Sequence, residues 1–239
     1  MKQRLDQLVV ARGLTRSRSQ AESYIRLGKV TVNTKVVLKA GLLVSDTDEI
    51  ELKSDEQYVS RAGLKLTSVA QLFGLDFRGK TVLDVGSSTG GFTDYALQHG
   101  AARVIAVDVG TDQLHPSLKN DERIELHEKT DIRDFYTDQP IDIVVADVSF
   151  ISLREILPSV SKLCSLRTQL VIMVKPQFEA RQSSVKHKGV IKNDKMRRQI
   201  LKDFEDWAQR HFVVLEKADS DVAGAKGNRE RFYLLKTLG

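Results

Sequence analysis

The feature that most constrains this chain is an apolar run that ends in a glycine-rich turn, TVLDVGSSTGGF, at residues 81–92. The run TVLDV has the composition of a buried strand, and the following TDYALQHG has that of a helix. Gly86, Gly90 and Gly91 allow the backbone of the turn to come close to a ligand, because no Cβ stands in the way. A strand, a glycine-rich turn and a helix in this order predict a cofactor site in an α/β fold.

Short apolar runs recur after this turn and are separated by segments of helix length. Continuous Val- and Ile-rich runs are typical of parallel strands buried on both faces of a sheet. A final pair of runs is expected to form two more strands. The pattern predicts a Rossmann-like α/β domain with a mostly parallel sheet over residues 61–239. The runs are TVLDVG, RVIAVDV, IDIVVADV and TQLVIMV, followed by HFVVLEKADS and RERFYLLKTL.

The acid that precedes the turn narrows the identity of the cofactor. A dinucleotide site would favour G-x-G-x-x-G, with a helix N-terminus directed at the pyrophosphate. Here the pattern is D-x-G-x-x-x-G-G, and its first residue is Asp84. A carboxylate at this position would repel a phosphate but can pair with an ammonium group. The pattern therefore favours S-adenosylmethionine, which carries an amino-acid ammonium and a positive sulfonium.

Two further acids support this interpretation. Asp108 ends the next strand, where an acid can hydrogen-bond the ribose hydroxyls. Asp131, in EKTDIRDF, is placed where the third strand should end and could reach the adenine amino group. The alternative is a structural βαβ repeat with three unrelated loop acids. The predicted cofactor-binding residues are Asp84, Gly86, Ser87, Ser88, Thr89, Gly90, Gly91, Asp108 and Asp131.

The N-terminal part of the chain is set apart by its charge. Residues 1–39 hold nine Lys or Arg against two acids, a net charge of +7, while the whole chain has a formal net charge of +5. The other 200 of the 239 residues therefore sum to −2. A basic module beside a near-neutral body favours a polyanionic partner. A solvated basic surface is an equally weighted alternative.

Residues 1–54 are expected to form a small α+β domain, joined to the larger one by a linker at residues 55–60. An apolar i, i+3, i+4 face predicts a first helix that ends at Gly13. A second helix is expected to reach Leu27, with a Ser or Thr cap at its start. The segments expected to be extended are KVTVN, VVLKAGLLV and DEIEL.

This N-terminal stretch resembles the small RNA-binding domain named after ribosomal protein S-four. The resemblance is carried by RLDQLVVARGLTRSRSQAESYIRLGKVTVN and then by V-x-x-AG-x-x-V-x-x-x-DEIEL. It implies binding of structured RNA through the helix pair. Clustered long cations bind a phosphate backbone and release counterions without reading the base sequence. The RNA contacts that the resemblance implies are Arg4, Arg12, Arg16, Arg18, Arg26 and Lys29.

Two kinds of methyl transfer are disfavoured by the residues present. Methylation of pyrimidine carbon five needs a cysteine nucleophile. The single cysteine, Cys164, lies in SKLCSL, which is expected to be a helix with the cysteine in the core. Methylation of an exocyclic amine usually shows an Asn/Asp-Pro-Pro-aromatic turn. The corresponding segment here, ADVSF at residues 146–150, has no proline.

Four short segments, SRAGLKL, ADVSF, VKPQFE and GAKGNRERF, resemble the motifs of the FtsJ-like ribose 2′-O-methyltransferases. The resemblance implies a catalytic set of Lys65, Asp147, Lys175 and Glu230. A ribose hydroxyl must lose its proton as the methyl group arrives, so Lys175 is expected to act as the general base. A neighbouring Lys65 disfavours the charged form of Lys175, and the two acids orient the lysines. A set of surface ion pairs is the alternative.

A strongly basic segment follows the VKPQFE motif. Residues 181–198, RQSSVKHKGVIKNDKMRR, hold seven Lys or Arg and one acid. The segment could close over a substrate RNA, or it could be a solvated loop. The helix expected to follow it carries Ile200, Phe204 and Trp207, which are predicted to lie in the core and not to stack on bases.

The whole chain resembles the TlyA family of rRNA cytidine 2′-O-methyltransferases, whose members often carry the label haemolysin. The resemblance implies that the partner is ribosomal RNA within a ribosomal subunit or ribosome. Shorter family members act on the large-subunit site alone, so we expect a large-subunit cytidine, with a small-subunit site as the alternative.

The composition predicts a cytoplasmic enzyme that uses no membrane and no metal. No apolar run approaches the roughly 20 residues of a membrane span, and the N-terminus lacks the features of a signal peptide. One cysteine and five scattered histidines leave no zinc-ligand spacing. Two rival classes are an inactive ribosome-assembly factor that binds RNA and, with less support, a haemolysin.

Overall fold

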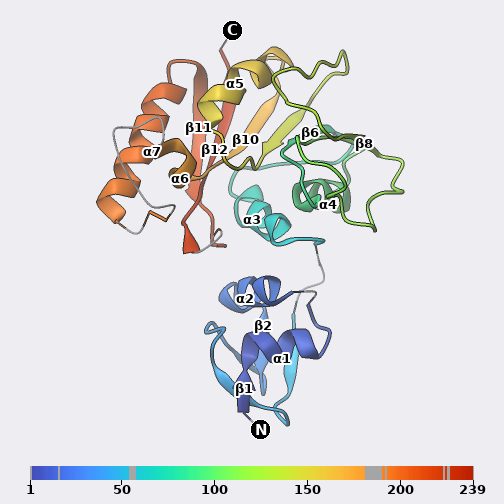
Figure 1. Cartoon of the computed structure of the whole chain (residues 1–239), viewed down its shortest axis with the longest axis vertical. Coiled ribbons are helices and arrows are strands. Elements are labelled where there is room, and N and C mark those ends of the chain that lie inside the picture. The colour runs from blue at the N-terminus through green and yellow to red at the C-terminus, as the bar shows by residue number, and fades with distance from the viewer. Residues whose placement is uncertain are drawn as a thin grey trace.

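A seven-stranded sheet forms the centre of the larger part of the chain (Figure 1). The structure is a computed structural model, and it describes residues 2–15, 17–53, 58–180, 190–191, 193–222, 224 and 227–238. The strands of this sheet are β6 (Thr81–Val85), β7 (Arg103–Val107), β8 (Ile124–His127), β9 (Ile143–Ala146), β10 (Gln169–Val174), β11 (Phe212–Asp219) and β12 (Arg231–Thr237).

The strand order is β11-β12-β10-β9-β6-β7-β8. β10, β9, β6, β7 and β8 pair in parallel, whereas β12 runs antiparallel to both of its neighbours. The expected Rossmann-like fold with a mostly parallel sheet is confirmed. The chain order reverses between β6 and β9, and in such sheets ligands bind outside the carboxyl ends of the strands at the reversal.

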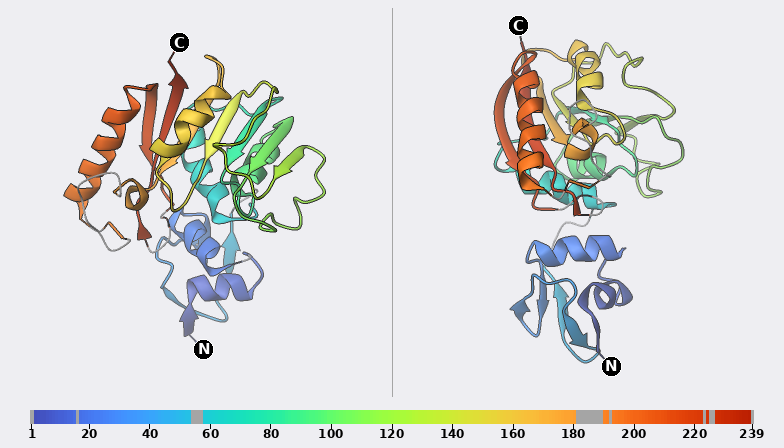
Figure 2. Two further views of the ribbon diagram at one scale, coloured as in Figure 1. Left: turned by 45° about the horizontal axis from the view of Figure 1, so that its top comes forward. Right: turned by 60° about the vertical axis from the view of Figure 1, so that its left-hand side comes forward.

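Helices cover both faces of the sheet (Figure 2). Successive strand residues point to opposite faces: Val82 belongs to the core under α3 and α4, whereas Leu83 belongs to the core under α5 and α7. Ile200 and Phe204 are fully buried, and Trp207 packs against the second core, as predicted. The helices are α3 (Arg61–Ala70), α4 (Gly91–Gln98), α5 (Leu153–Lys162), the short α6 (Pro176–Glu179) and α7 (Asp194–Ala208).

The N-terminal part combines two helices with two small sheets. One sheet pairs β1 with β4, and the other has the order β3-β2-β5. The left-handed φ of Gly13 and Gly28 (71° and 69°) follows the two helices, as glycine allows. The elements are β1 (Lys2–Arg4), α1 (Leu5–Ala11), α2 (Arg18–Arg26), β2 (Val30–Val32), β3 (Lys35–Val36), β4 (Leu43–Ser45) and β5 (Ile50–Leu52).

The segment VVLKAGLLV is less extended than its sequence predicts. Strand pairing covers only its two ends, and a turn closes between them, where the Leu42 N–H donates to the carbonyl of Lys39. The carbonyls of Ala40 and Leu42 accept from the first residues of α1 instead of a neighbouring strand. The backbone of this segment is therefore satisfied by the start of a helix, a partner that strand alternation does not reveal.

Tyr58 joins the two parts of the chain, although its neighbours have the composition of a linker. Its side chain is 1% exposed and its carbonyl accepts from Gln20 Nε2 at 2.8 Å. Its ring lies against Gly63 of α3, where a Cβ would overlap the ring, and 5.4 Å from the ring of Tyr95 in α4. Residues 54–57 lie outside the described residues. α2 is the helix of the N-terminal part that faces α3 (Figure 1).

Candidate active site

Four charged side chains meet at one edge of the sheet. Asp147 directly follows β9, and Lys175 directly follows β10. Glu230 directly precedes β12, which is antiparallel to β10 with Arg231 opposite Val174, so Glu230 and Lys175 lie at the same edge. Lys65 reaches this edge from α3. The structure thus brings together the whole catalytic set that the sequence motifs predicted.

The four groups form a continuous chain of ion pairs. Lys65 Nζ lies 2.6 Å from Glu230 Oε2 and 4.0 Å from Asp147 Oδ2. Lys175 Nζ lies 2.6 Å from Asp147 Oδ1 and also donates to Ser149 Oγ at 2.8 Å. The side chains are between 2% and 14% exposed, so each charge depends on its partners for solvation. Asp147 contacts both lysines and links the two halves. The role of each group in a reaction remains a prediction.

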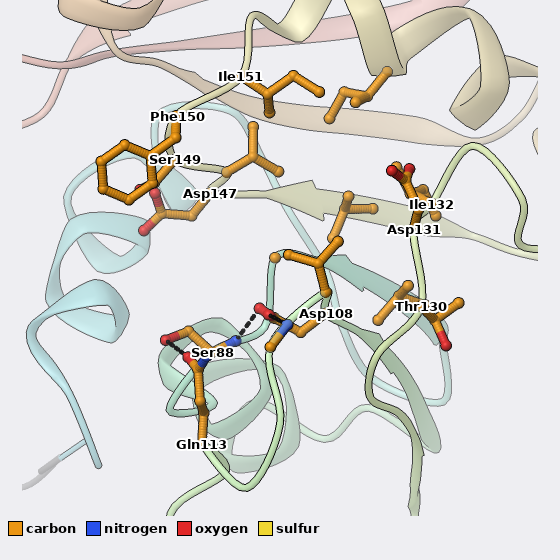
Figure 3. Close-up of a pocket in the computed structure, with 17 residues that line it drawn as sticks. Ser88, Asp108, Gln113, Thr130, Asp131, Ile132, Asp147, Ser149, Phe150 and Ile151 are labelled. Carbon is orange, nitrogen blue, oxygen red and sulfur yellow. Dashed lines mark hydrogen bonds between the residues drawn. The ribbon is translucent and has the colours of Figure 1, made fainter.

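A cavity of about 400 Å³ opens beside Asp147 at the carboxyl ends of β6, β7 and β9 (Figure 3). Among the predicted cofactor residues, Gly86, Ser88, Asp108 and Asp131 line this cavity. Its wall near the catalytic set is formed by the segment 147–151. The lining combines apolar surface with a few convergent polar groups, which is typical of a small-molecule site.

Asp108 is oriented by the glycine-rich turn. Its Oδ2 accepts from the Ser88 N–H at 2.8 Å, and its Oδ1 accepts from the Gly110 N–H at 2.7 Å. The Ser88 hydroxyl in turn donates to Gln113 Oε1 at 2.9 Å (Figure 3). Ser88 has a left-handed φ of 45°, which lets its N–H point at Asp108. A carboxylate fixed at a cavity in this way still has free lone pairs for ligand hydroxyls.

Asp84 is buried within β6 and does not line the cavity. Its Oδ2 accepts from the Thr93 hydroxyl at 2.7 Å, and among the described residues its Oδ1 has no hydrogen-bond partner. Burial raises the pKa of Asp84 to about 7. Because Asp84 is buried and absent from the cavity lining, its predicted contact with a ligand ammonium group is not seen in the geometry of the cavity.

The remaining residues of the turn do not line the cavity either. Ser87 and Thr89 are absent from its lining. A Cβ on Gly90 would meet the side chains of Leu114 and Leu118, and one on Gly91 would overlap Ser60 Oγ. These two glycines allow close packing of the turn, a use that the sequence pattern does not separate from ligand binding.

Asp131 lies at the cavity but not at the end of a strand. β8 ends at His127, four residues earlier. The sequence did not locate this strand, because the run IELH is short and half of its residues are polar. The Arg133 guanidinium, 2.6 Å from Asp131 Oδ2, holds the pKa of this carboxyl below its usual range. The expected position is therefore corrected, while the proximity to the cavity stands.

Phe150 was missed by the motif analysis. Its ring is 76% exposed, its φ is +69°, and it lies 5.3 Å from the ring of Phe178. A bulky residue in the left-handed region is strained, and such residues concentrate at functional sites. The signal available in the sequence was an aromatic residue four positions after an apolar strand, which alone is weak.

Cys164 follows α5 and packs partly buried against the second core. Burial raises the pKa of its thiol to about 12, so the thiolate is scarce at neutral pH. Cys164 lies two residues beyond the end of α5, so the expected helical position is corrected, while its packing against the core agrees with the prediction. A cysteine of this kind is unsuited to nucleophilic attack on a pyrimidine.

Two of the predicted RNA contacts share one buried carboxylate. Asp6 is fully buried in α1 and lies 2.8 Å from guanidinium nitrogens of both Arg4 and Arg18. The hydrogen bonds to these arginines outweigh burial and lower the pKa of Asp6. Both guanidinium groups are thereby held in place with further N–H donors available. Arg16 lies outside the described residues.

The other predicted RNA contacts differ in whether their side chains already bond to the protein. Arg12 donates to the backbone carbonyls of Asp46 and Asp48, both at 2.8 Å. Arg26 forms an exposed ion pair with Glu22, and Lys29 is exposed. Part of the Arg12 side chain therefore serves the fold of the N-terminal part.

Most of the basic segment 181–198 lies outside the described residues. Its end forms the start of α7, and Arg197 in this turn is only 4% exposed. Arg197 is thus unavailable to a substrate RNA, which corrects that part of the expectation. Of the described helices, none is both long and apolar enough to cross a membrane. In the same residues no group of three or more His, Cys, Asp or Glu could hold a metal.

The strand order and the position of the cavity define a class I S-adenosylmethionine-dependent methyltransferase fold. A family model described as FtsJ-like methyltransferase matches residues 58–237, and one described as S4 domain matches residues 3–50. The Mycobacterium tuberculosis 16S/23S rRNA (cytidine-2′-O)-methyltransferase TlyA is 38% identical, over 98% of this chain and 90% of that protein. The chain belongs to the TlyA family of FtsJ-like methyltransferases.

Other relatives carry a different label. Hemolysin A of Brachyspira hyodysenteriae is 39% identical over 95% of this chain and 97% of that protein. A solved structure from Streptococcus thermophilus, which carries a hemolysin label, has a TM-score of 0.72 at 36% identity and covers 99% of this chain and 88% of that chain. The similarity therefore extends over both parts of the chain.

Proposed function

We propose that this chain transfers a methyl group from S-adenosylmethionine to the 2′-hydroxyl of a cytidine ribose in ribosomal RNA. The observation that carries the proposal is the ion-pair chain of Lys65, Asp147, Lys175 and Glu230, which lies beside a cavity of cofactor size. The name of the Mycobacterium tuberculosis relative supports the nucleotide and the ribose position.

The residues at the cavity fit S-adenosylmethionine. The fixed Asp108 carboxylate would accept hydrogen bonds from the ribose hydroxyls, and Asp131 lies where it could meet the adenine edge. The backbone at Gly86 and Ser88 would face the amino-acid end of the ligand. When bound, the cofactor supplies an electrophilic methyl group.

Proton transfer is the task of the charged set. With Lys175 unprotonated, the four groups carry a net charge of −1, and uptake of the ribose hydroxyl proton returns them to neutrality. Asp147 orients Lys175 through the 2.6 Å contact, and Lys65 and Glu230 hold Asp147 from the other side. The charged set would thus take up the proton that the ribose hydroxyl loses as it is methylated.

We propose a division of labour between the two parts of the chain. Residues 1–54 would capture folded rRNA through their basic surface, and residues 61–239 would methylate one exposed ribose within a cytoplasmic ribosomal subunit or ribosome. The target nucleotide would have to leave its helix to reach Lys175, since that side chain is recessed and only 10% exposed.

The first prediction concerns the reaction itself. Lys175→Ala should abolish methyl transfer to rRNA while S-adenosylmethionine affinity changes less than about twofold, because Lys175 does not line the cavity. The matched control is Lys162→Ala, which removes an exposed lysine at the end of α5 and should keep full activity. The measurement is mass spectrometry of nuclease-digested rRNA from both subunits, with and without the protein.

Three outcomes of this experiment are informative. Gain of one 2′-O-methylcytidine fragment identifies the reaction, the base and the subunit together. Full activity of Lys175→Ala would contradict the assigned base. Tight S-adenosylmethionine binding by the unaltered protein, with no methylated product in any rRNA fraction, would instead favour a ribosome-assembly factor.

A further inference from the structure

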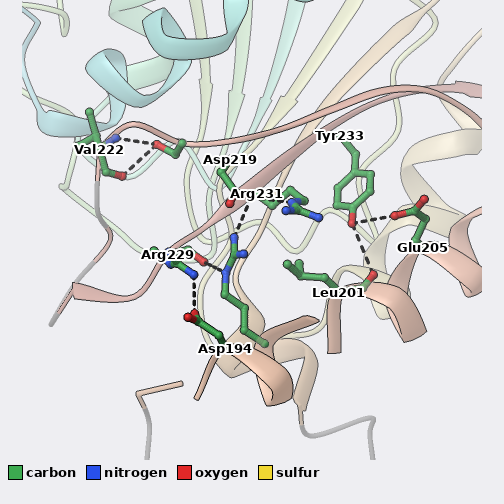
Figure 4. A network of polar contacts seen from close by, with 10 residues as sticks. Asp194, Leu201, Glu205, Asp219, Val222, Arg229, Arg231 and Tyr233 are labelled. Atoms are coloured by element: carbon green, nitrogen blue, oxygen red, sulfur yellow. Dashed lines mark hydrogen bonds and ion pairs between the residues drawn. The ribbon is translucent and has the colours of Figure 1, made fainter. Parts of the chain in front are cut away.

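Arg229 and Arg231, the sequence neighbours of Glu230, belong to a network of arginines and aspartates that lies outside the ion-pair chain (Figure 4). Asp219, the last residue of β11, is opposite Arg231 in the antiparallel pair of β11 and β12. Arg231 Nε donates to Asp219 Oδ1 at 2.6 Å. The residue that directly follows Glu230 is therefore tied to the neighbouring strand by a charged hydrogen bond.

Arg197 of α7 links Arg229, which directly precedes Glu230, to the carboxylate of Asp219. Its Nε donates to the Arg229 carbonyl at 3.0 Å, and its Nη2 donates to Asp219 Oδ1 at 2.8 Å. The Glu230 carbonyl itself accepts from the Ser220 N–H at 3.0 Å. The backbone at Glu230 is thus held before, at and after the residue.

The chemistry of arginine suits this position. A guanidinium group is planar and presents donors in fixed directions, so one side chain can bond a carbonyl and a carboxylate together. The Arg197 side chain is 5% exposed and Asp219 is its charged partner, which compensates the burial. A lysine would keep the charge but could not reproduce both directions at once.

There is little free room around the carboxylate of Glu230. Its Oε2 lies 2.6 Å from Lys65 Nζ, and a Cβ on Gly224 would overlap its Oε1. A small displacement of the backbone at residue 230 would therefore either break the contact with Lys65 or press the carboxylate on Gly224. Displacements of about 1 Å can lower catalytic rates on the order of 100-fold.

We propose that Arg197 and Asp219 are positioning residues that fix Glu230, and through it Lys65, relative to Lys175. The inference rests on the proposed methyl transfer and adds two residues that touch neither the cavity nor the ion-pair chain. It also assigns a role to Arg197, which the charge of its sequence segment had associated with RNA.

The test is a double-mutant cycle in the full-length protein. Arg197→Lys should lower kcat about 10- to 100-fold, with KM for rRNA and the affinity for S-adenosylmethionine within about twofold of the unaltered protein. In a Glu230→Gln background the same change should have little further effect, because Arg197 acts through Glu230. Asp219→Asn should behave like Arg197→Lys. Thermal unfolding of each variant establishes that it is folded at the assay temperature.

The matched control is Asp194→Asn, which removes the exposed ion pair with Arg229 and one acid from the first turn of α7, and should leave kcat unchanged. Equal kcat for Arg197→Lys and the unaltered protein would overturn the inference and leave the proposed function intact. The same holds if the effects of Arg197→Lys and Glu230→Gln are additive, as expected of a merely structural brace. If the unaltered protein transfers no methyl group, the proposed function fails and the inference falls with it.

Discussion

At the scale of single residues, the surroundings of a carboxyl group decide whether its charge is stabilised. Asp147 lies between two lysines, whereas the buried Asp84 accepts from the Thr93 hydroxyl and has no ion pair among the described residues. Burial raises the pKa of Asp84, so its surroundings disfavour the ionised carboxylate. Asp84 within β6 and Asp147 after the neighbouring β9 thus lie in different electrostatic surroundings.

The pKa of Asp84, raised to about 7 by burial, predicts a pH-dependent stability. In the unfolded chain an aspartate titrates near about 3.9, so between these values the folded state binds more protons and loses stability as pH rises. Asp84→Asn removes this contribution. The free energy of unfolding of the variant, relative to the unaltered protein, should therefore increase from about pH 5 to pH 8, by at most about 1.4 kcal/mol per pH unit.

The measurement is denaturant unfolding of both proteins across this pH range, without cofactor. Asp76→Asn is a matched control, because that carboxylate is exposed and its pKa is lowered to about 2 by Arg78, so it does not titrate in this range. A stability difference between Asp84→Asn and the unaltered protein that stays constant with pH would contradict the raised pKa.

Residues of the candidate site were predictable from the sequence where they follow the end of a recognisable strand. Asp147 and Lys175 each follow a strand that was evident from the sequence. The burial of Arg197 was not predictable, because it depends on a carbonyl at residue 229 and on a carboxylate in a different strand. A high local density of basic residues indicates side chains exposed to solvent or RNA. Partners that are distant in the sequence can bury such a side chain nevertheless.

At the scale of elements, the helices that follow β9 and β10 are fastened to each other by Glu179. This residue ends α6, is 1% exposed and accepts from the Ser152 hydroxyl and from the Leu153 N–H, both at 2.7 Å. Arg154 Nε lies 3.6 Å away. Burial raises the pKa of Glu179 despite these donors. The N-terminus of α5 is therefore capped by a side chain from α6, beside the segment that carries Asp147.

Glu179→Ala should destabilise the protein by about 2–4 kcal/mol, because it leaves a buried N–H and a hydroxyl without their acceptor and the Arg154 guanidinium without its ion-pair partner. Denaturant unfolding checks this value. Glu155→Ala removes an exposed acid from the first turn of the same α5 and should cost less than about 1 kcal/mol. Equal losses in the two variants would show that Glu179 contributes only through the helix dipole.

Elements with a strong apolar period were predicted well, and short polar ones were not. The Val- and Ile-rich strands of the large sheet appear where the sequence places them. β8 and β1 carry no such run and form because neighbouring strands offer a free edge. Their existence depends on partners distant in the sequence, which local periodicity does not contain.

At the scale of the whole molecule, the basic surface of the N-terminal part should dominate RNA affinity. Arg18→Gln, Arg26→Gln and Lys29→Gln combined should reduce the steepness of log K against log salt by about 2, at roughly 0.7–0.9 per lost phosphate contact. The measurement is rRNA binding over a series of salt concentrations.

The control for this prediction changes the net charge equally at another place. Its three substitutions, Lys162→Gln, Arg167→Gln and Lys202→Gln, lie on exposed sites of the larger part. If both triple variants lose the same salt dependence, net charge alone would account for binding, and the N-terminal surface would have no special role.

The partly buried Cys164 has a consequence for observing this molecule at work. It is the single cysteine in the chain, and its thiol, with a pKa of about 12, reacts slowly with electrophilic dyes at neutral pH. A second cysteine placed on an exposed site would therefore take up a fluorophore selectively without removal of the native one. The arrival of RNA at the N-terminal part could then be followed in time, separately from the chemical step.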